Sequence, residues 1–213
     1  MHIPKGETSE QEILTFREAL EERKPDREYD LGRWLYVPDH YSEYRYILGT
    51  RGERPLIAVG INPSTAAPDD LDNTLKSVER IALGNGYDSF LMMNVYAQRA
   101  TDPDTMDRLF NPLLHEENMR AFRYCLSLAG REPRVWAAWG SISEKRTYLT
   151  DCIADMTEAA AEAGAVWLRA GPLSRAGHPH HPLYLKKDTV LEPFDADGYI
   201  RERKKKEREK ARK

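Results

Sequence analysis

The stretch that decides the fold is "PLIAVGINPSTA", residues 55–66, in which an apolar run ends in a polar turn. The run "PLIAVGI" has no polar–apolar alternation and contains β-branched side chains, so it predicts a strand that is buried on both faces. Gly60, Asn62, Pro63 and Ser64 are typical of a connection between a strand and a helix. The stretch therefore indicates a βα unit, and it raises the question of what the amide of Asn62 does at this turn.

After this unit the chain continues to alternate between helical and strand patterns. We expect a helix capped by Asp72 or Thr74 and two further helices at residues 115–129 and 143–164. Buried strands are expected in "SFLMMNVY", "RVWAAWG" and "AVWLRAG". Strands that alternate with helices form parallel sheets covered on both faces. The sequence therefore predicts an α/β fold with three α/β/α layers and a central, mostly parallel four-stranded sheet.

Two segments precede the first of these strands. Residues 8–24 have apolar side chains at helical spacing and predict a helix. The segment "RWLYVPDHYSEYRYILGT" is rich in aromatic residues and predicts strands around a Pro-Asp turn. We interpret residues 1–200 as one domain, in which residues 1–30 form an N-terminal helical extension.

The composition is that of a globular protein with an uneven charge distribution. Hydrophobic residues make up 40% of the chain, and no apolar run is long enough to span a bilayer. Since no secretory signal is visible, we expect a cytoplasmic location and reduced cysteines. Residues 201–213 form a basic tail with nine Lys or Arg and three Glu, a charge of +6; the whole chain carries −3, so residues 1–200 carry −9. The tail predicts either attraction to nucleic-acid phosphates or a solvated charged helix.

Polar side chains follow each of the four predicted strands, at the edge where open α/β sheets bind ligands. Asn62 follows the first strand, Asn94 ends the second, and Ser141 follows the third. The loop after the fourth strand contains "HPHHPL", in which His178 and His181 each precede a proline. Each residue has a structural alternative, such as a strand-end hydrogen bond, a helix cap or a surface turn. Their convergence on one edge instead predicts a ligand site.

Four segments, in this order, resemble motifs of the uracil-DNA glycosylase superfamily. They are "GINPS", "FLMMNVYAQRA", "AWGSISEK" and "HPLYL", and the first is closest to the mismatch-specific branch. Within that group the chain most resembles the uncharacterised family DUF1643, through Tyr44-Arg45-Tyr46, "NPSTA" and "HPLYL". The resemblance covers residues 55–186 and implies a uracil-DNA glycosylase-like fold.

The resemblance implies a monofunctional DNA glycosylase, which hydrolyses the N-glycosidic bond of a flipped-out nucleotide and leaves an abasic site. Negative charge builds on the departing base, so the reaction needs a positioned water and a hydrogen-bond donor to that base. By resemblance, Asn62 positions the water and His181 donates to the base. His181 is preferred to His178 because only this register places Leu185 where the family has a leucine that fills the gap left by the base.

The same resemblance implies roles for other residues. Asn94 is expected to bind the Watson–Crick edge of a flipped pyrimidine. Ser64 stands where strict uracil enzymes have a tyrosine that blocks C5 substituents, which implies a 5-substituted base, such as those of phage DNA. An enzyme that removes such bases is expected to act in defence against phage, although no residue indicates this role. Further base-binding residues are Ile61 and Tyr96, and the residues expected to contact DNA are Ser141, Lys145, Leu185, Lys186 and Thr65.

No metal or cofactor is expected, because glycosidic hydrolysis needs neither and the acidic stretch "DDLDNT" is interpreted as a helix cap and a loop. DNA is the expected partner, the protein is expected to be a monomer, and no membrane contact is expected. Two alternatives remain open at this stage. One is a hydrolase or transferase for free nucleotides or nucleosides on the same scaffold, and the other is a catalytically silent module that binds modified DNA.

Overall fold

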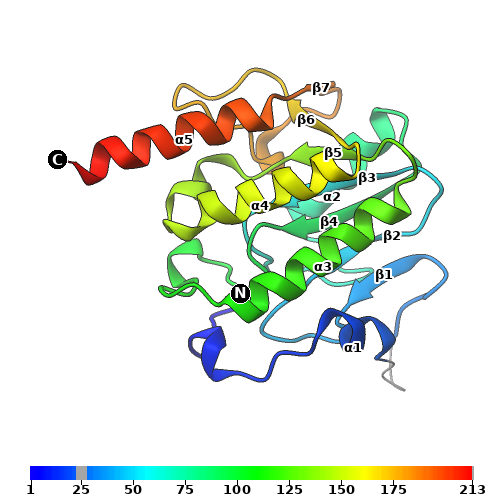
Figure 1. Ribbon diagram of the computed structural model, residues 1–213. Helices are drawn as coiled ribbons and strands as arrows, with labels where there is room; N and C mark the ends of the chain where they lie inside the picture. Colours follow the sequence, from blue (N-terminus) through cyan, green and yellow to red (C-terminus); the bar gives the residue numbers. More distant parts are fainter. Residues whose placement is uncertain (23–27, 213) are drawn as a thin grey trace.

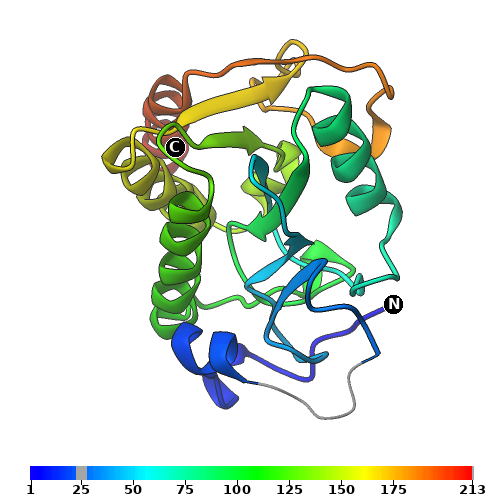
Figure 2. The same ribbon diagram turned by 90° about the vertical axis from the view of Figure 1, so that its right-hand side faces the viewer.

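A computed structural model describes residues 1–22 and 28–212, which form a seven-stranded sheet with helices on both faces (Figures 1 and 2). The strands are β1 (Trp34–Val37), β2 (Ile47–Thr50), β3 (Pro55–Gly60), β4 (Ser89–Asn94), β5 (Arg134–Ala137), β6 (Val166–Ala170) and β7 (Leu191–Pro193). The α-helices are α1 (Phe16–Glu21), α2 (Asn73–Gly84), α3 (Pro112–Leu128), α4 (Tyr148–Glu162) and α5 (Ala196–Ala211). Short 3₁₀ helices are η1 (Thr8–Glu10), η2 (Pro103–Thr105), η3 (Gly140–Glu144) and η4 (Pro182–Tyr184).

Strand β3 lies at the centre of the sheet, whose order is β1-β2-β4-β3-β5-β6-β7. It pairs in parallel with β4 on one side and with β5 on the other, and β5 pairs in parallel with β6. All residues of β3 and β4 are buried, as expected for uninterrupted apolar runs. The predicted α/β class is confirmed, and the four predicted strands form the parallel centre of the sheet.

The prediction of four strands is wrong, because three antiparallel strands extend this centre. Strand β2 pairs with β1 and with β4, and β7 pairs with β6. The aromatic segment does form two strands, but its sequence does not reveal that they join the central sheet, because that pairing is not local. Strand β7 has three residues, too few to show a two-residue period.

Helices α1, α3, α4 and α5 cover one face of the sheet, and α2 covers the other (Figures 1 and 2). On the α2 face, Val78 and Ile81 pack in one cluster with Leu56 and Trp136. Helix α2 begins as predicted, because the carboxylate of Asp72 accepts a hydrogen bond from the N–H of Leu75. This cap places the N-terminus of α2 beside the turn that follows β3.

Two predicted helices are shorter than the sequence pattern. The helix expected over residues 8–24 is reduced to η1 and α1, because Thr15 and Glu18 form a capping box that starts α1 at Phe16; residues 23–24 lie outside the described chain. The helix expected over 143–164 begins at Tyr148, because η3 precedes it. None of the helices in the described ranges combines the length and the apolar character needed to cross a bilayer.

The contact between β2 and β4 leaves no room for a side chain at Gly49, where a Cβ atom would overlap the carbonyl oxygen of Phe90. We expect Gly49→Ala to lower the free energy of unfolding by about 1–3 kcal/mol, as overpacking does. Urea unfolding followed by tryptophan fluorescence measures this change. Gly84→Ala is the matched control, because a Cβ there has its nearest neighbour at 3.7 Å. A Gly49→Ala variant as stable as the control contradicts the close approach of these strands.

Candidate functional site

Residues from three neighbouring strands and from the loop after β6 meet at the carboxyl edge of the sheet. Gly60 at the end of β3 pairs with Asn94 at the end of β4, and a Cβ on Gly60 would lie 3.0 Å from Oδ1 of Asn94. Asn62 follows Gly60 by two residues. Gly140 follows β5, and a Cβ at this glycine would lie 3.3 Å from the Cβ of His181. The topology therefore brings both asparagines and His181 to one edge.

The amide of Asn94 is buried without a hydrogen-bond partner. The residue is 1% exposed, and neither Nδ2 nor Oδ1 has a partner among the described residues. Its backbone carbonyl is held by Nδ2 of Asn118 at 2.8 Å, which fixes the strand end. An unpaired buried polar group costs about 1–3 kcal/mol, so a ligand that pairs with it regains that energy. Asn94 therefore has an NH2 group and a carbonyl oxygen that no described residue pairs with.

The amide of Asn62 is held through its nitrogen. Nδ2 donates to the carbonyl oxygen of Ala100 and, at 3.3 Å, to that of Pro63. These bonds fix the amide orientation and leave Oδ1 without a hydrogen bond in the part of the chain that the structure describes. A fixed carbonyl oxygen is the group needed to accept a hydrogen bond from a water molecule.

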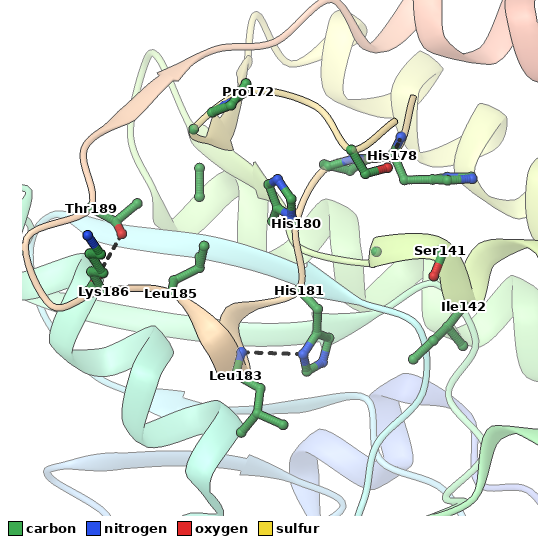
Figure 3. A pocket seen from close by; sticks show the side chains of 15 residues that line it. Ser141, Ile142, Pro172, His178, His180, His181, Leu183, Leu185, Lys186 and Thr189 are labelled. Carbon is green, nitrogen blue, oxygen red and sulfur yellow. Dashed lines mark hydrogen bonds between the residues drawn. The ribbon is translucent and has the colours of Figure 1, made fainter. Parts of the chain in front are cut away.

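The imidazole of His181 has a defined tautomer. Its Nδ1 accepts a hydrogen bond from the backbone N–H of Leu183 at 3.3 Å (Figure 3), so in the neutral ring the proton is on Nε2. Burial lowers the pKa of His181 below its usual value, and the negative charge of Asp72 opposes that shift. At neutral pH the ring is therefore uncharged and carries one N–H donor at Nε2.

His178, the other histidine of the predicted pair, is part of a buried network. It is 1% exposed, its Nδ1 lies 2.9 Å from the hydroxyl of Tyr199, and its Nε2 lies 3.1 Å from Oε1 of Glu144. Burial lowers its pKa. Because both nitrogens of His178 have partners, His181 is the residue of the two with an unused ring nitrogen.

A cavity of about 760 Å³ opens beside His181 (Figure 3). Ser141, Leu185 and Lys186, three of the residues predicted to contact DNA, also line it. Asn62 and Asn94 are not among the residues that line this cavity. His181 and three residues that were predicted to contact DNA therefore line one cavity. The amides of Asn62 and Asn94 lie at the same edge of the sheet but do not line this cavity.

Asp72 interacts with Ser64 in the loop after β3 and affects His181 in the loop after β6. Its carboxylate accepts hydrogen bonds from the Leu75 N–H at 2.9 Å and from the hydroxyl of Ser64, and its charge acts on His181. The loop after β3 is therefore hydrogen-bonded to the N-terminus of α2, and His181 in the loop after β6 lies near enough for the charge of Asp72 to affect its pKa. From the sequence we predicted only a capping role for Asp72, because nothing local shows that a second loop comes near the same carboxylate.

Two buried arginines hold the loop after β3. Nη1 of Arg45 donates to the carbonyl oxygen of Ala66 at 2.9 Å, and Nη1 of Arg99 donates to that of Ser64. Burial lowers the pKa of both, that of Arg45 to about 9, so both stay charged at neutral pH. No role was predicted for Arg45 or Arg99 from the sequence; the available signal was an arginine within the aromatic stretch Tyr44-Arg45-Tyr46.

Tyr96, predicted to bind the base together with Asn94, does not lie on the same face of the sheet as Asn94. Strand β4 ends at Asn94, and Tyr96 enters the core on the opposite face, where its hydroxyl donates to Asp107 at 2.6 Å. Ile61 is also buried in that core. The structure therefore does not bring Tyr96 or Ile61 to the exposed part of the edge.

Three other residues predicted to contact DNA, Lys145, Ser141 and Thr65, lie in different surroundings from one another. Lys145 is outside the cavity lining, and its Nζ lies 2.7 Å from the carboxylate of Asp104. Ser141 lies within η3 and caps no helix, because α4 starts seven residues later. Thr65 is half-buried in the loop after β3.

The fold and the edge define an α/β protein with a polar site at the carboxyl ends of its parallel strands. A family model described as "Protein of unknown function (DUF1643)" matches residues 45–183, which include Arg45, Asn62, Asn94 and His181. Since this match covers more than half of the chain, the protein belongs to the DUF1643 family. No curated protein and no solved structure matches the chain.

The effect of Asp72 on His181 can be measured directly. Asp72→Asn removes the negative charge that favours the imidazolium, so we expect the pKa of His181 to fall further, and asparagine still caps α2. Two-dimensional ¹H–¹⁵N spectra of the histidine rings follow the titration. Asp70→Asn, which removes an equal charge at an exposed neighbour, is the control. An unchanged pKa in Asp72→Asn contradicts the electrostatic effect of Asp72 on His181.

Proposed function

We propose that the protein is a DNA glycosylase that hydrolyses the N-glycosidic bond of a flipped-out, 5-substituted pyrimidine and leaves an abasic site. The observation that carries this proposal is the unpaired, buried amide of Asn94 at the edge that also holds Asn62 and His181. A pyrimidine presents donors and acceptors on its Watson–Crick edge, so a flipped base pairs with such an amide. The four motifs that resemble the uracil-DNA glycosylase superfamily support the proposal and a related layout of the fold.

The chemistry assigns different roles to Asn62 and His181. Oδ1 of Asn62 accepts a hydrogen bond from the water whose oxygen forms the new bond to C1′ of the sugar. The C1′–N bond breaks, its electron pair leaves with the base, and the proton lost by the water ends on that base. Nε2–H of His181 donates to the base oxygen while negative charge develops there. A neutral imidazole suits this role because it provides one fixed donor.

The choice of a 5-substituted base rests on Ser64. Serine is much smaller than the tyrosine that the resemblance implies at this position in strict uracil enzymes. Its hydroxyl is bound to Asp72, so the side chain is held at the N-terminus of α2. We propose hypermodified pyrimidines of phage DNA as the substrate class and defence against phage as the setting.

A free nucleotide is the second candidate substrate, because residues 1–200 carry a net charge of −9, which disfavours broad contact with a polynucleotide. Hydrolysis of mononucleotides, with no abasic sites formed in DNA, supports this alternative. Intact binding to modified DNA without hydrolysis of any substrate instead supports a silent binding module.

Substitution of the two reacting side chains tests the mechanism. We expect Asn62→Ala and His181→Gln each to slow single-turnover formation of abasic sites by about 100- to 10,000-fold, the usual range for groups that act in proton transfer or hydrogen bonding to the transition state. His40→Gln, a substitution outside the site, is the control. Rates equal to that of the wild type in both variants contradict the assigned roles.

The rate is also expected to depend on pH. Protonation places a hydrogen on Nδ1 of His181, where it opposes the N–H of Leu183 and breaks that hydrogen bond. The rate is therefore expected to be constant at neutral pH and to fall as the pH drops below the pKa of His181, which is under its usual value of about 6.5. Single-turnover rates between pH 5 and 8 measure the profile, and a rate that rises toward acid pH contradicts a neutral donor.

A panel of oligonucleotides tests the substrate class. Matched duplexes and single strands contain uracil, a thymine mismatch or glucosylated hydroxymethylcytosine at one position. We expect cleavage of the bulky 5-substituted base, because Ser64 leaves C5 unblocked. Cleavage restricted to uracil contradicts this part of the proposal and leaves the glycosylase activity intact.

A further inference from the structure

We propose that a nucleic-acid strand leaves the His181 cavity across the loop formed by residues 172–178 and follows the basic surface of α5. This inference rests on the proposed function, since it assumes a polynucleotide ligand, and it names the surface that holds the strand. The surface is defined here as the α5 track, and it consists of Arg169, Arg201, Lys205, Lys206, Arg208, Lys210 and Arg212.

Helix α5 is anchored to the site by a buried charge network. Arg203 is 6% exposed and donates to Oε1 of Glu144, and the same oxygen lies 3.1 Å from Nε2 of His178. Tyr199 of α5 also binds His178 and the hydroxyl of Ser143, at 2.9 and 3.2 Å. A charged tail that is surrounded by solvent would not form such buried contacts with the rest of the protein. The network fixes the basic helix relative to η3 and to the loop that carries His181.

Two separate cavities adjoin the loop of residues 172–178, one beside His181 and one beside α5. Pro172 lines both the cavity beside His181 and a second cavity of about 730 Å³ under α5. The second cavity is lined by Arg169, Arg201 and Lys206, together with the carboxylates of Asp195 and Glu202. Arg169 is paired with Glu192 at 3.1 Å, so part of its charge is compensated. The three cations here are therefore matched by three carboxylates, and the excess of positive charge lies farther along α5.

The far half of α5 has an excess of positive charge, since residues 204–212 contain six Lys or Arg and the two carboxylates of Glu207 and Glu209. Lys205, Arg208, Lys210 and Arg212 are exposed and form no ion pair with the described residues, whereas Lys204 is paired with Asp151 at 3.0 Å. Figure 1 shows this half of α5 extending beyond α4. Since the rest of the protein is acidic, a polyanion is attracted to this helix and repelled elsewhere. Uncompensated cations release bound counterions when phosphates replace them, which favours nucleic acid as the occupant.

Charge reversal on the exposed half of α5 tests the track in the full-length protein. The test variant combines Lys205→Glu, Arg208→Glu, Lys210→Glu and Arg212→Glu, and leaves the buried Arg203 network intact. The control variant makes the same change in charge on other elements: Arg54→Glu, Lys76→Glu, Arg108→Glu and Arg131→Glu, all at exposed positions. Circular dichroism and thermal melting verify that both variants fold.

Fluorescence anisotropy measures the binding of labelled single- and double-stranded oligonucleotides at several salt concentrations. We expect the test variant to bind at least about tenfold more weakly at 0.1 M salt and to have a shallower dependence of log K on log[salt] by about 2–4, as loss of phosphate contacts predicts. The control variant is expected to keep a slope like that of the wild type. Equal loss in both variants overturns the track, as does binding of the wild type to anionic lipid vesicles without binding to oligonucleotides.

The same samples separate this inference from the proposed activity. Abasic-site formation by the wild type, with unchanged affinity in the test variant, overturns the track and leaves the hydrolysis in place. Loss of affinity in the test variant, with no hydrolysis by the wild type on any substrate, supports the track and counts against the activity.

Discussion

The pairing of β3 with β4 on one side and β5 on the other is the constraint on which the site depends. The register sets Gly60 opposite Asn94, and the absence of a side chain at Gly60 gives the amide of Asn94 its space. A shift of one residue would turn Asn94 toward the other face of the sheet. The buried cations of Arg45 and Arg99 then hold the carbonyl groups of the loop after β3, so the strand register and the loop conformation together orient the polar groups at the edge.

The parts of the fold that follow from local pattern could be predicted. Strands β3 and β4 are formed by largely apolar runs, and helix α2 has both an Asp72 cap and apolar positions at helical spacing. What could not be predicted depends on distant partners. The addition of β1, β2 and β7 requires free sheet edges, and the start of α4 is set by η3, whose sequence resembles the first turn of a helix.

The candidate site shows the same division. The convergence of Asn62, Asn94 and His181 could be predicted, because it requires only that parallel strands end at one edge. The position of Tyr96 depended on how far β4 extends, and the strand ends two residues too early for the alternation to apply. Asp72 accepts a hydrogen bond from Ser64, and its charge raises the pKa of His181, which lies more than 100 residues further along the chain. Neither charge nor spacing in the sequence indicates this second interaction.

In the proposed function, Asn94 and His181 bind a single pyrimidine base. An NMR titration of the protein with free uracil, thymine and 5-hydroxymethylcytosine tests this by following the side-chain amide of Asn94 and the ring nitrogens of His181. We expect at least one base to shift both sets of signals with the same dissociation constant. Different dissociation constants for the two sets of signals, or no shift with any of the bases, would contradict the binding of one base by Asn94 and His181.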